Sequence, residues 1–322
     1  MKLLITGGAG FIGFHLAKLF VSKNYQVDLT DVIDPLDMDD ELVDLKNHSK
    51  CNYIKYNLLN SNQKNIFDND YDFIIHLAAI VGVENVLSDS YGVLNKNFLM
   101  LTRVINIAQS QIKRTKLIFA STSEVYAGSQ YHQRIEYPTA ENTILTLPDL
   151  KSPRTSYMLS KIYGEAICHA SNLDFLILRP HNIYGPRMGM KHVIPQLLKK
   201  ILLTPENGTL DVFSPNHTRT FCYVTYAAEK ILDLLEQPFK NKLVLNLGVS
   251  QEEIKIKELA KILTEVCDRK DITIKEVEDT QGSPSRRLPD TSKLINSTKN
   301  TKIPSLIEGI THTYNWYKKF LK

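Results

Sequence analysis

The first half of the chain alternates short apolar segments with segments whose apolar residues recur at helical spacing. The short segments are almost continuously apolar, which is typical of strands buried on both faces of a parallel sheet. Strands are predicted at residues 2–6, 26–30, 53–56, 73–77, 116–120 and 175–179, and helices at 11–23, 97–110 and 156–170. This order predicts an α/β fold built on a doubly wound parallel sheet.

Prolines interrupt the second half of the chain, where the pattern is less regular. Helical spacing recurs at residues 192–203, 226–235 and 256–267, and a strand at 243–246 is placed to return to the main sheet. We therefore expect two domains. The larger comprises residues 1–179 with about 221–248, and a smaller α/β C-terminal domain comprises about 180–220 with 249–322.

The turn after the first predicted strand carries a glycine pattern. Gly8, Gly10 and Gly13 satisfy G-x-G-x-x-G within the segment TGGAGFIG. Glycines allow the backbone to approach a pyrophosphate closely, and the helix that follows offers unpaired N–H groups at its N-terminus. Asp31 ends the second strand about 20 residues later, where a carboxylate can accept from an adenosine ribose and repel a 2′-phosphate. The pattern predicts a Rossmann-type domain that binds NAD rather than NADP.

Several other positions are expected to contact this cofactor. Asn57 and Leu58 are placed to flank the adenine, although an Asn at this point is also a common turn residue. The full set of expected cofactor contacts is Gly7, Gly10, Phe11, Ile12, Gly13, Asp31, Asn57, Leu58, Leu77, Ala78, Ala79 and Asn97, together with Tyr157 and Lys161.

Tyr157 and Lys161 stand four residues apart on a predicted helix and therefore share one face of it. A phenol has an ordinary pKa of about 10, and a nearby ammonium group lowers that pKa by stabilising the phenolate. The pair can then remove a proton from an alcohol while NAD accepts the hydride. Taken alone such a pair is usually an ordinary surface pair, and its position after a complete dinucleotide fingerprint is what favours catalysis.

Hydroxyl and carboxylate side chains follow the strand predicted at 116–120. Thr122, Ser123 and Glu124 stand at its carboxyl end, where α/β sheets bind ligands. The same residue types are also typical of helix N-caps and turns, so their spacing alone leaves both interpretations open.

Composition excludes several classes of protein. The chain has 322 residues, of which 43% are apolar, and its net charge of +4 is too small to indicate a nucleic-acid or membrane partner. No apolar run is long enough to cross a membrane, and the first residues do not resemble a signal peptide. Four widely spaced cysteines indicate neither a metal site nor a disulfide framework. We expect a reduced, cytoplasmic chain without a metal.

Taken together, these motifs resemble the extended short-chain dehydrogenase/reductase enzymes that modify nucleotide sugars. The resemblance covers nearly the whole chain and rests on TGGAGFIG (6–13), Asp31, HLAA (76–79), STSEVY (121–126), YMLSK (157–161), RPHNIYGPR (179–187), RTFCYV (219–224) and RRLPD (286–290). It implies an NAD-dependent enzyme that oxidises the sugar C4 hydroxyl and then dehydrates, decarboxylates or epimerises the 4-keto sugar. It also implies that the C-terminal domain binds the nucleotide sugar.

The resemblance assigns roles to individual residues. Tyr157 is implied to be the base, with Lys161 as its partner and as a ligand of the nicotinamide ribose. Thr122 is implied to hydrogen-bond the sugar O4, and Glu124 to handle the C5 proton or position the sugar. The implied substrate contacts are Ser123, Asn182, Arg187, Arg219 and Arg287, of which Arg219 and Arg287 clamp the diphosphate. Arg286 and Arg287 are adjacent and would point apart, so only one is expected in this role.

The second chemical step stays open at this stage. Ser123 replaces the Asp that dTDP-glucose-type 4,6-dehydratases use as an acid, which disfavours that type. Thr-Ser-Glu resembles GDP-mannose dehydratases and UDP-glucuronate decarboxylases, and RRLPD also resembles the decarboxylases. HLAAIVGV resembles the epimerases instead.

Other functions remain as alternatives. One is a 4-dehydrogenase that stops at the 4-keto sugar and retains NADH. Another is a non-catalytic dinucleotide-sensing regulator, which the intact Tyr157 and Lys161 disfavour. A third is a dehydrogenase for a free alcohol, which has no use for a diphosphate clamp. The resemblance further implies a homodimer formed through the helices that begin near Asn97 and Ser156.

Overall fold

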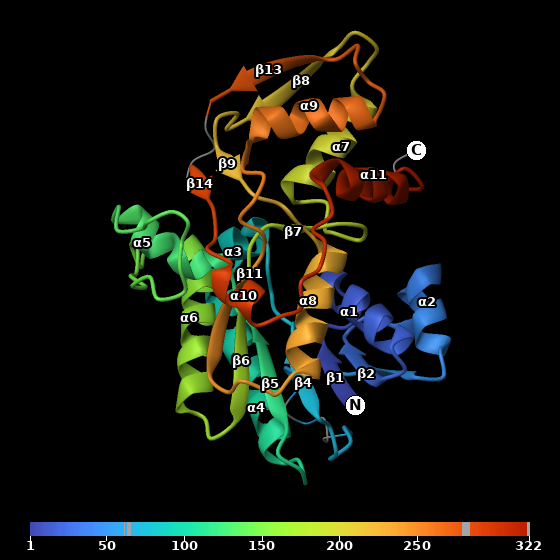
Figure 1. Ribbon diagram of the computed structural model, residues 1–322, viewed down its shortest axis with the longest axis vertical. Helices are drawn as coiled ribbons and strands as arrows, with labels where there is room; N and C mark the ends of the chain where they lie inside the picture. Colours follow the sequence, from blue (N-terminus) through green and yellow to red (C-terminus); the bar gives the residue numbers. More distant parts are fainter. Residues whose placement is uncertain (61, 63–65, 279–283, 321–322) are drawn as a thin grey trace. The chain divides into compact units, whose positions relative to one another are not determined.

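The computed structural model describes residues 1–60, 62, 66–278 and 284–320 (Figure 1). The chain divides into two compact units, and each is described by itself. Unit 1 consists of Met1–Arg134, Ile144–Pro180 and Ile231–Leu245, and unit 2 of Ile135–Thr143, His181–Lys230 and Asn246–Lys322.

This division differs from the expected domain boundaries at residues 135–143, at 221–230 and, by three residues, at 246–248. Residues 135–143 belong to unit 2, because the Thr139 N–H donates to the Leu288 carbonyl (2.8 Å) and the Asp290 N–H donates to the Thr139 carbonyl (2.8 Å). Residues 221–230 also belong to unit 2 rather than to the larger unit.

Unit 1 is built on a seven-stranded sheet in the order β11-β6-β5-β4-β1-β2-β3 (Figure 1). The strands from β3 to β6 along this order pair in parallel, which confirms the doubly wound α/β fold. Its strands are β1 (Lys2–Thr6), β2 (Gln26–Asp31), β3 (Cys51–Lys55), β4 (Phe73–His76), β5 (Lys116–Ala120), β6 (Asp174–Pro180) and β11 (Leu243–Leu247). Its helices are α1 (Phe11–Ser22), α2 (Asp40–Asn47), α3 (Val83–Ser88), α4 (Ser90–Gln109), α5 (Ala127–Tyr131) and α6 (Arg154–Ala170), with the 3-10 helices η1 (Pro35–Asp37) and η2 (Ser123–Tyr126).

Both faces of this sheet are buried, as its near-continuous apolar strands require. Leu4, Ile74 and Leu117 point to one face, where they pack with Leu101 and Val104 of α4. Their neighbours on the same strands point to the other face because side chains alternate along a strand, and they are equally buried: Leu3, Ile5, Ile75 and Ile118. Burial of both sets fixes the strand register, since a shift by one residue would exchange the two faces.

Helix α4 begins seven residues before the predicted start at Asn97. The Asp89 side chain accepts from the Gly92 N–H (2.7 Å) and caps the helix at this earlier point. The added turns include Tyr91, which is exposed, and they therefore lack the apolar periodicity that predicted the rest of the helix.

Unit 2 contains shorter elements. They are β7 (Ile183–Tyr184), α7 (Val193–Leu203), β8 (Thr209–Phe213), β9 (Thr218–Arg219), β10 (Cys222–Tyr223), β12 (Ile254–Lys255), α9 (Ile256–Val266), β13 (Thr273–Val277), β14 (Arg286–Arg287), α10 (Ser292–Asn296) and α11 (Leu306–Tyr317); α8 (Val224–Glu236) begins here and continues into unit 1. The strands form the sheets β10-β7, β12-β9-β14 and β13-β8. None of the described helices in either unit is long and apolar enough to cross a membrane.

Helix α11 was not among the predicted elements. Ser305 caps it, with its hydroxyl accepting from the Glu308 N–H (3.3 Å) while the Glu308 carboxylate accepts from the Ser305 N–H (2.8 Å). Leu306 and Ile310 are buried on its inner face, and α11 packs against α9. Polar and aromatic residues fill the rest of its sequence, so the helical periodicity is weak.

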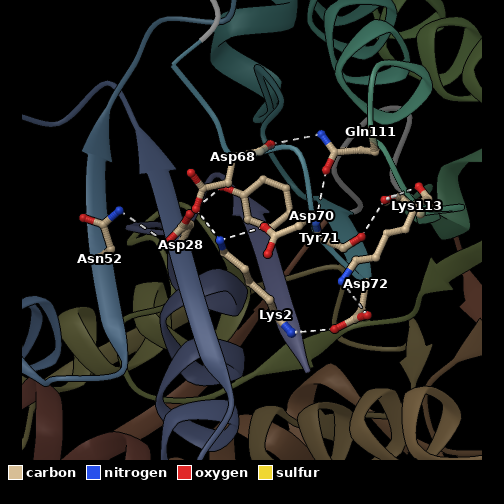
Figure 2. Close-up of polar contacts among 10 residues, drawn as sticks. Lys2, Asp28, Asn52, Asp68, Asp70, Tyr71, Asp72, Gln111 and Lys113 are labelled. Atoms are coloured by element: carbon tan, nitrogen blue, oxygen red, sulfur yellow. Dashed lines mark hydrogen bonds and ion pairs between the residues drawn. The ribbon is translucent and has the colours of Figure 1, made fainter.

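The amino ends of β1, β2 and β4 carry a polar network (Figure 2). The buried Tyr71 hydroxyl donates to the Asp28 carboxylate, which also accepts from Asn52 Nδ2 (3.3 Å). Lys2 forms ion pairs with Asp68 and Asp70 at the surface. Surface pairs of this kind contribute about 0–1 kcal/mol, so the buried bond at Asp28 dominates the network.

We expect Tyr71→Phe to lower the free energy of unfolding by about 1–3 kcal/mol, because the buried Asp28 carboxylate loses a hydrogen-bond donor. Urea denaturation followed by circular dichroism measures this change. Tyr25→Phe is the matched control, since its hydroxyl donates to Glu236 at the surface (2.8 Å), and it should change stability by about 0.5 kcal/mol or less. Equal effects of the two substitutions would contradict the role of Asp28.

Candidate active site

The glycine turn packs backbone against backbone at the carboxyl end of β1. Gly7 adopts a positive φ of 72°, and a Cβ there would lie 2.7 Å from the Ala78 nitrogen. A Cβ on Gly13 would lie 2.4 Å from the Gly7 carbonyl oxygen. Side chains are therefore excluded at both positions, and the first turn of α1 lies directly against the turn.

The N-terminus of α1 fits an anionic group. Its N-cap is Gly10, which has no side chain to occupy the free N–H groups, and its first turn contains no acidic residue. Phe11 and Ile12 supply the first N–H groups of the helix, at the positive end of its dipole. This cradle matches the pyrophosphate of a dinucleotide.

Asp31 is held in place by hydrogen bonds from the glycine turn and from the next residue. Its carboxylate accepts from the Ala9 N–H (3.1 Å) through Oδ2 and from the Val32 N–H (2.8 Å) through Oδ1. The Thr30 carbonyl accepts from the N–H groups of Gly7 (2.9 Å) and Gly8 (3.1 Å). The end of β2 and the glycine turn are thus one hydrogen-bonded unit with a half-buried carboxylate, whose contact with a ribose stays a prediction.

The segment after β4 is fixed by a buried histidine that sequence reasoning did not identify. His76 Nδ1 lies 2.7 Å from the Thr6 hydroxyl, which also accepts from the Ala78 N–H (3.4 Å). Burial, together with the charge of Lys161, lowers the pKa of His76 to about 3, so the ring is neutral at physiological pH. The bond holds half-buried Leu77, Ala78 and Ala79 beside the glycine turn.

Two of the expected cofactor contacts, Asn97 and Leu58, have side chains that make internal contacts. The Asn97 side chain is buried, accepts from the Ile80 N–H (2.7 Å), and donates to the Ile80 carbonyl (3.1 Å) and to Ser160 (3.2 Å). It therefore braces the loop after β4, and its contact with the cofactor stays a prediction. The Leu58 side chain lies in the apolar core, so only its backbone could face the adenine. Asn57 closes a turn by accepting from the Leu59 N–H (2.9 Å) and is exposed.

Tyr157 and Lys161 lie on α6 and face β5. The Lys161 side chain is buried, and its Nζ donates to the Ala120 carbonyl (2.7 Å). The same Nζ lies 5.0 Å from the centroid of the Phe119 ring and 5.9 Å from that of the Tyr157 ring. Burial lowers the pKa of Lys161 to about 8, so the group is still largely an ammonium at neutral pH. A cation thus lies beside a half-buried phenol, as activation of the phenol requires.

The hydroxyl-rich segment after β5 forms η2. The Thr122 hydroxyl accepts from the Glu124 N–H (3.2 Å) and caps this short helix. Thr122 and Glu124 are half-buried, whereas Ser123 between them is buried. The N-cap interpretation is therefore correct for Thr122, and it leaves the hydroxyl hydrogen free to donate.

The expected substrate residues other than Ser123 belong to unit 2. Arg219 on β9 lies opposite Arg287 on β14, and Thr218 lies opposite Arg286. On the Thr218 side, Glu253 accepts two bonds from Arg286 (2.7 Å each) and one from Thr218 (2.5 Å). Neighbouring residues of a strand face opposite sides, so Arg287 and Arg219 share the other side. The Arg219 guanidinium donates to the Thr218 carbonyl (2.7 Å) and to the Pro284 carbonyl, and the opposite orientation of Arg286 and Arg287 stays a prediction.

The other two residues of this set have unusual backbone conformations. Asn182 has a φ of 42°, and its amide donates to the Thr220 carbonyl (2.9 Å). Arg187 has a φ of 68° and is half-buried. Positive φ values in non-glycine residues are uncommon and often occur at functional sites.

Comparison with known proteins agrees with this geometry. Residues 3–248 match the model of the NAD dependent epimerase/dehydratase family. Relatives include a UDP-N-acetyl-alpha-D-glucosaminuronate decarboxylase of Bacillus cytotoxicus (29% identity, covering 99% of this chain and 98% of that one) and an uncharacterized UDP-glucose epimerase of Bacillus subtilis (29%, 97% and 96%). A solved structure of the UDP-glucuronic acid 4-epimerase of Bacillus cereus, in complex with UDP-glucuronic acid and NAD, has a TM-score of 0.83 (26% identity, 99% of each chain).

The chain therefore belongs to the NAD-dependent epimerase/dehydratase family. It is an enzyme, and NAD is its cofactor. The function expected from the sequence, oxidation of a nucleotide sugar at C4 followed by a second step, is confirmed at this level. The residues assigned to each role stay predictions.

We expect Asp31→Asn to weaken discrimination against NADP. The amide can still accept from the Ala9 N–H, but the charge that repels a 2′-phosphate is lost. The ratio of NAD to NADP affinity, measured by calorimetry on protein freed of cofactor, should fall about 10-fold, or about 1.4 kcal/mol. Asp34→Asn removes a neighbouring carboxylate that pairs with Lys55 and is the control. An unchanged ratio would rule out the assigned role of Asp31.

We also expect the stability of the protein to depend on pH through Lys161. Its pKa is about 8 in the folded chain and ordinarily 10.5. Between these values the unfolded chain holds a proton that the folded chain has lost, so raising the pH through this window stabilises the folded state. Lys161→Met removes this dependence. From pH 8 to 10.5 the unfolding free energy of the parent should therefore rise relative to that of the variant. An unchanged difference between the two proteins would contradict the lowered pKa of the buried Lys161.

Proposed function

We propose that the chain oxidises C4 of a UDP-linked uronate and that the resulting 4-keto uronate loses its 6-carboxylate as carbon dioxide. The observation that carries the first step is the buried Lys161 ammonium beside Tyr157, next to the segment of Thr122 and Glu124. The similarity to a UDP-uronate decarboxylase and to a UDP-glucuronic acid 4-epimerase over nearly the whole chain supports the substrate class.

The base in this proposal is Tyr157. The Lys161 charge favours the phenolate form of Tyr157, which removes the proton from the C4 hydroxyl. Thr122 holds the same oxygen by a hydrogen bond, because its hydroxyl hydrogen is not used in capping η2. NAD, bound by the glycine turn and Asp31, supplies the hydride acceptor.

Decarboxylation is the second step that these residues support best. A ketone at C4 lies β to a carboxylate at C6, so the electrons of the C5–C6 bond can pass to the C4 oxygen as carbon dioxide leaves. A proton then returns to C5, and we assign its control to Glu124. Return of the hydride to C4 and of the proton from Tyr157 to the C4 oxygen would then restore the oxidised cofactor, so that carbon dioxide is the net loss. Loss of a C6 hydroxyl as water would instead need an acid, and the residue at position 123 is a buried serine.

The diphosphate is assigned to Arg219 and Arg287. Glu253 neutralises Arg286. The Arg219 guanidinium, which donates to the Thr218 (2.7 Å) and Pro284 carbonyls, and that of Arg287 in the opposite register position supply two further positive charges. Two cations match the two negative charges of a nucleoside diphosphate sugar, and guanidinium groups bind phosphate in bidentate geometry. Asn182 and Arg187 are proposed to contact the substrate in the same unit.

Epimerisation at C4 with the carboxylate retained is the second candidate. The similarity in fold to the UDP-glucuronic acid 4-epimerase, with a TM-score of 0.83, favours it. The two reactions share every step up to the 4-keto uronate.

Mass spectrometry of the products distinguishes these reactions. The purified protein is incubated with UDP-glucuronate, UDP-N-acetylglucosaminuronate and, for comparison, UDP-glucose. We expect loss of carbon dioxide from a uronate. An unchanged mass with a new retention time would identify the epimerase, loss of two hydrogens a 4-dehydrogenase, and loss of water a dehydratase. No change in any uronate would overturn the proposal.

Tyr157→Phe should lower kcat by about 10²- to 10⁴-fold, because the proton acceptor is removed. Binding of NAD, followed by calorimetry, should be unchanged. Tyr131→Phe, at an exposed tyrosine of α5, is the control and should leave kcat as it is. Glu124→Gln should spare oxidation at C4 and slow only the second step. Normal turnover by Tyr157→Phe would exclude this residue as the base.

We further propose that the enzyme is a cytoplasmic homodimer formed through α4 and α6. Tyr91 and Leu99 on α4 and Tyr163 on α6 are exposed apolar or aromatic side chains, which are common at interfaces. All four cysteines are buried and unpaired, which agrees with a reducing compartment. Leu99→Asp should convert a dimer to a monomer in sedimentation experiments. A parent chain that sediments as a monomer would contradict the proposal.

A further inference from the structure

A buried ion pair lies behind the segment that carries Thr122 and Glu124. Glu165 on α6 is 6% exposed, and Arg179 on β6 is 4% exposed. Arg179 Nε donates to Glu165 Oε1 (2.9 Å), and Arg179 Nη2 donates to Glu165 Oε2 (2.7 Å). The two planar groups therefore meet in a bidentate arrangement, which fixes the orientation of both side chains.

The remaining bonds of this pair reach the two ends of the Ser121–Tyr126 segment. The Ser121 hydroxyl donates to Glu165 Oε1 at the first residue. Arg179 Nη1 donates to the Tyr126 hydroxyl (2.7 Å) at the last residue, and the guanidinium carbon lies 5.0 Å from the centroid of the Tyr126 ring. The residues between are thus held from both sides by one rigid pair.

The cost of burial indicates that stability alone does not explain this pair. Removing two charges from water costs several kcal/mol per ion, and an apolar pair of similar volume often gives equal or greater stability. Arg179 follows the fully apolar residues 175–178 of β6, where an apolar side chain would satisfy packing. What an apolar pair cannot provide is the set of directed bonds to Ser121 and Tyr126.

We propose that Glu165 and Arg179 are positioning residues that clamp both ends of the Ser121–Tyr126 segment and so set the positions of Thr122 and Glu124. The proposal rests on the proposed function for the roles of those two residues. Glu165 also stands one helical turn after Lys161, so the same carboxylate favours the ammonium form of Lys161 by its charge. A shift of the segment of about 1 Å would misalign a reacting group and can cost about 10²-fold in rate.

The clamp is tested at its outer ends, where the ion pair itself stays intact. Ser121→Ala and Tyr126→Phe each remove one hydroxyl. Each is expected to lower kcat about 10-fold while KM stays within about twofold, and the double variant should lose less than the product of the two, because release of either end frees the segment.

Two matched controls separate positioning from stability. Ser129→Ala removes a buried hydroxyl that donates to the Ile144 carbonyl, and Tyr71→Phe removes one that donates to Asp28. Both should lower the Tm as much as the test variants do and leave kcat unchanged. If kcat follows the Tm in all four variants alike, the proposal is overturned.

Hydrogen–deuterium exchange gives a readout that needs no substrate. Peptides that cover residues 121–126 should exchange faster in Ser121→Ala and Tyr126→Phe than in the parent, and at the parent rate in Ser129→Ala and Tyr71→Phe. Unchanged exchange in the test variants would overturn the clamp. Faster exchange in a chain that turns over no uronate would support the clamp and reject the proposed function instead.

Discussion

The in-register parallel pairing of β1, β2, β4, β5 and β6 is the constraint on which unit 1 depends. Thr6 lies opposite both Thr30 and His76, His76 lies opposite Phe119, and Ala120 lies opposite Leu178. The strands therefore end at one level. The carboxyl ends of these strands carry the glycine turn, Asp31, the HLAA segment and the Thr122 segment. Open parallel sheets bind ligands at this end of their strands. The amino ends of β1, β2 and β3 carry the polar network of Figure 2.

Buried polar groups just below this edge set the details of the site. His76 is neutral and braces a loop, Lys161 is a buried cation against a carbonyl oxygen, and Glu165 with Arg179 forms a fully bonded ion pair. Each would be costly if its partner were absent, because an unpaired polar group in the interior loses its hydration without compensation. Their bonds hold the loop after β4, the Lys161 side chain and the hydroxyl segment each in a defined position.

Local features of the sequence predicted the fold and the cofactor turn. The continuous apolar strands identified the sheet, and the glycines could be assigned because only residues without a Cβ fit beside Ala78 and the Gly7 carbonyl. Arg286 pairs with Glu253, which leaves Arg287 as the tandem arginine predicted to bind the diphosphate. The surroundings of other predicted site residues depend on tertiary contacts that the sequence pattern does not contain. Leu58 and Asn97 have suitable residue types and positions, but core packing and the Ile80 loop occupy their side chains.

Two signals for the ion pair were present in the sequence but not used. Arg179 ends a run of apolar residues, so its charge requires a partner if it is buried. Glu165 follows Lys161 by one helical turn and therefore lies on the same face of α6. Helix α11, by contrast, has no comparable signal. Its apolar residues are interspersed with threonine, tyrosine and histidine, and packing against α9 is what defines its buried face.

Hydride removal from C4 is the step for which the cofactor turn, Tyr157 and Lys161 are proposed. A kinetic isotope effect measures this step directly. UDP-glucuronate carrying deuterium at C4 is mixed with the enzyme in a single-turnover, stopped-flow experiment, and the absorbance of reduced nicotinamide is followed. The account predicts that reduced nicotinamide forms transiently and forms more slowly from the deuterated sugar than from the unlabelled one. Turnover of the sugar without any reduced nicotinamide, or with equal rates for both sugars, would contradict it.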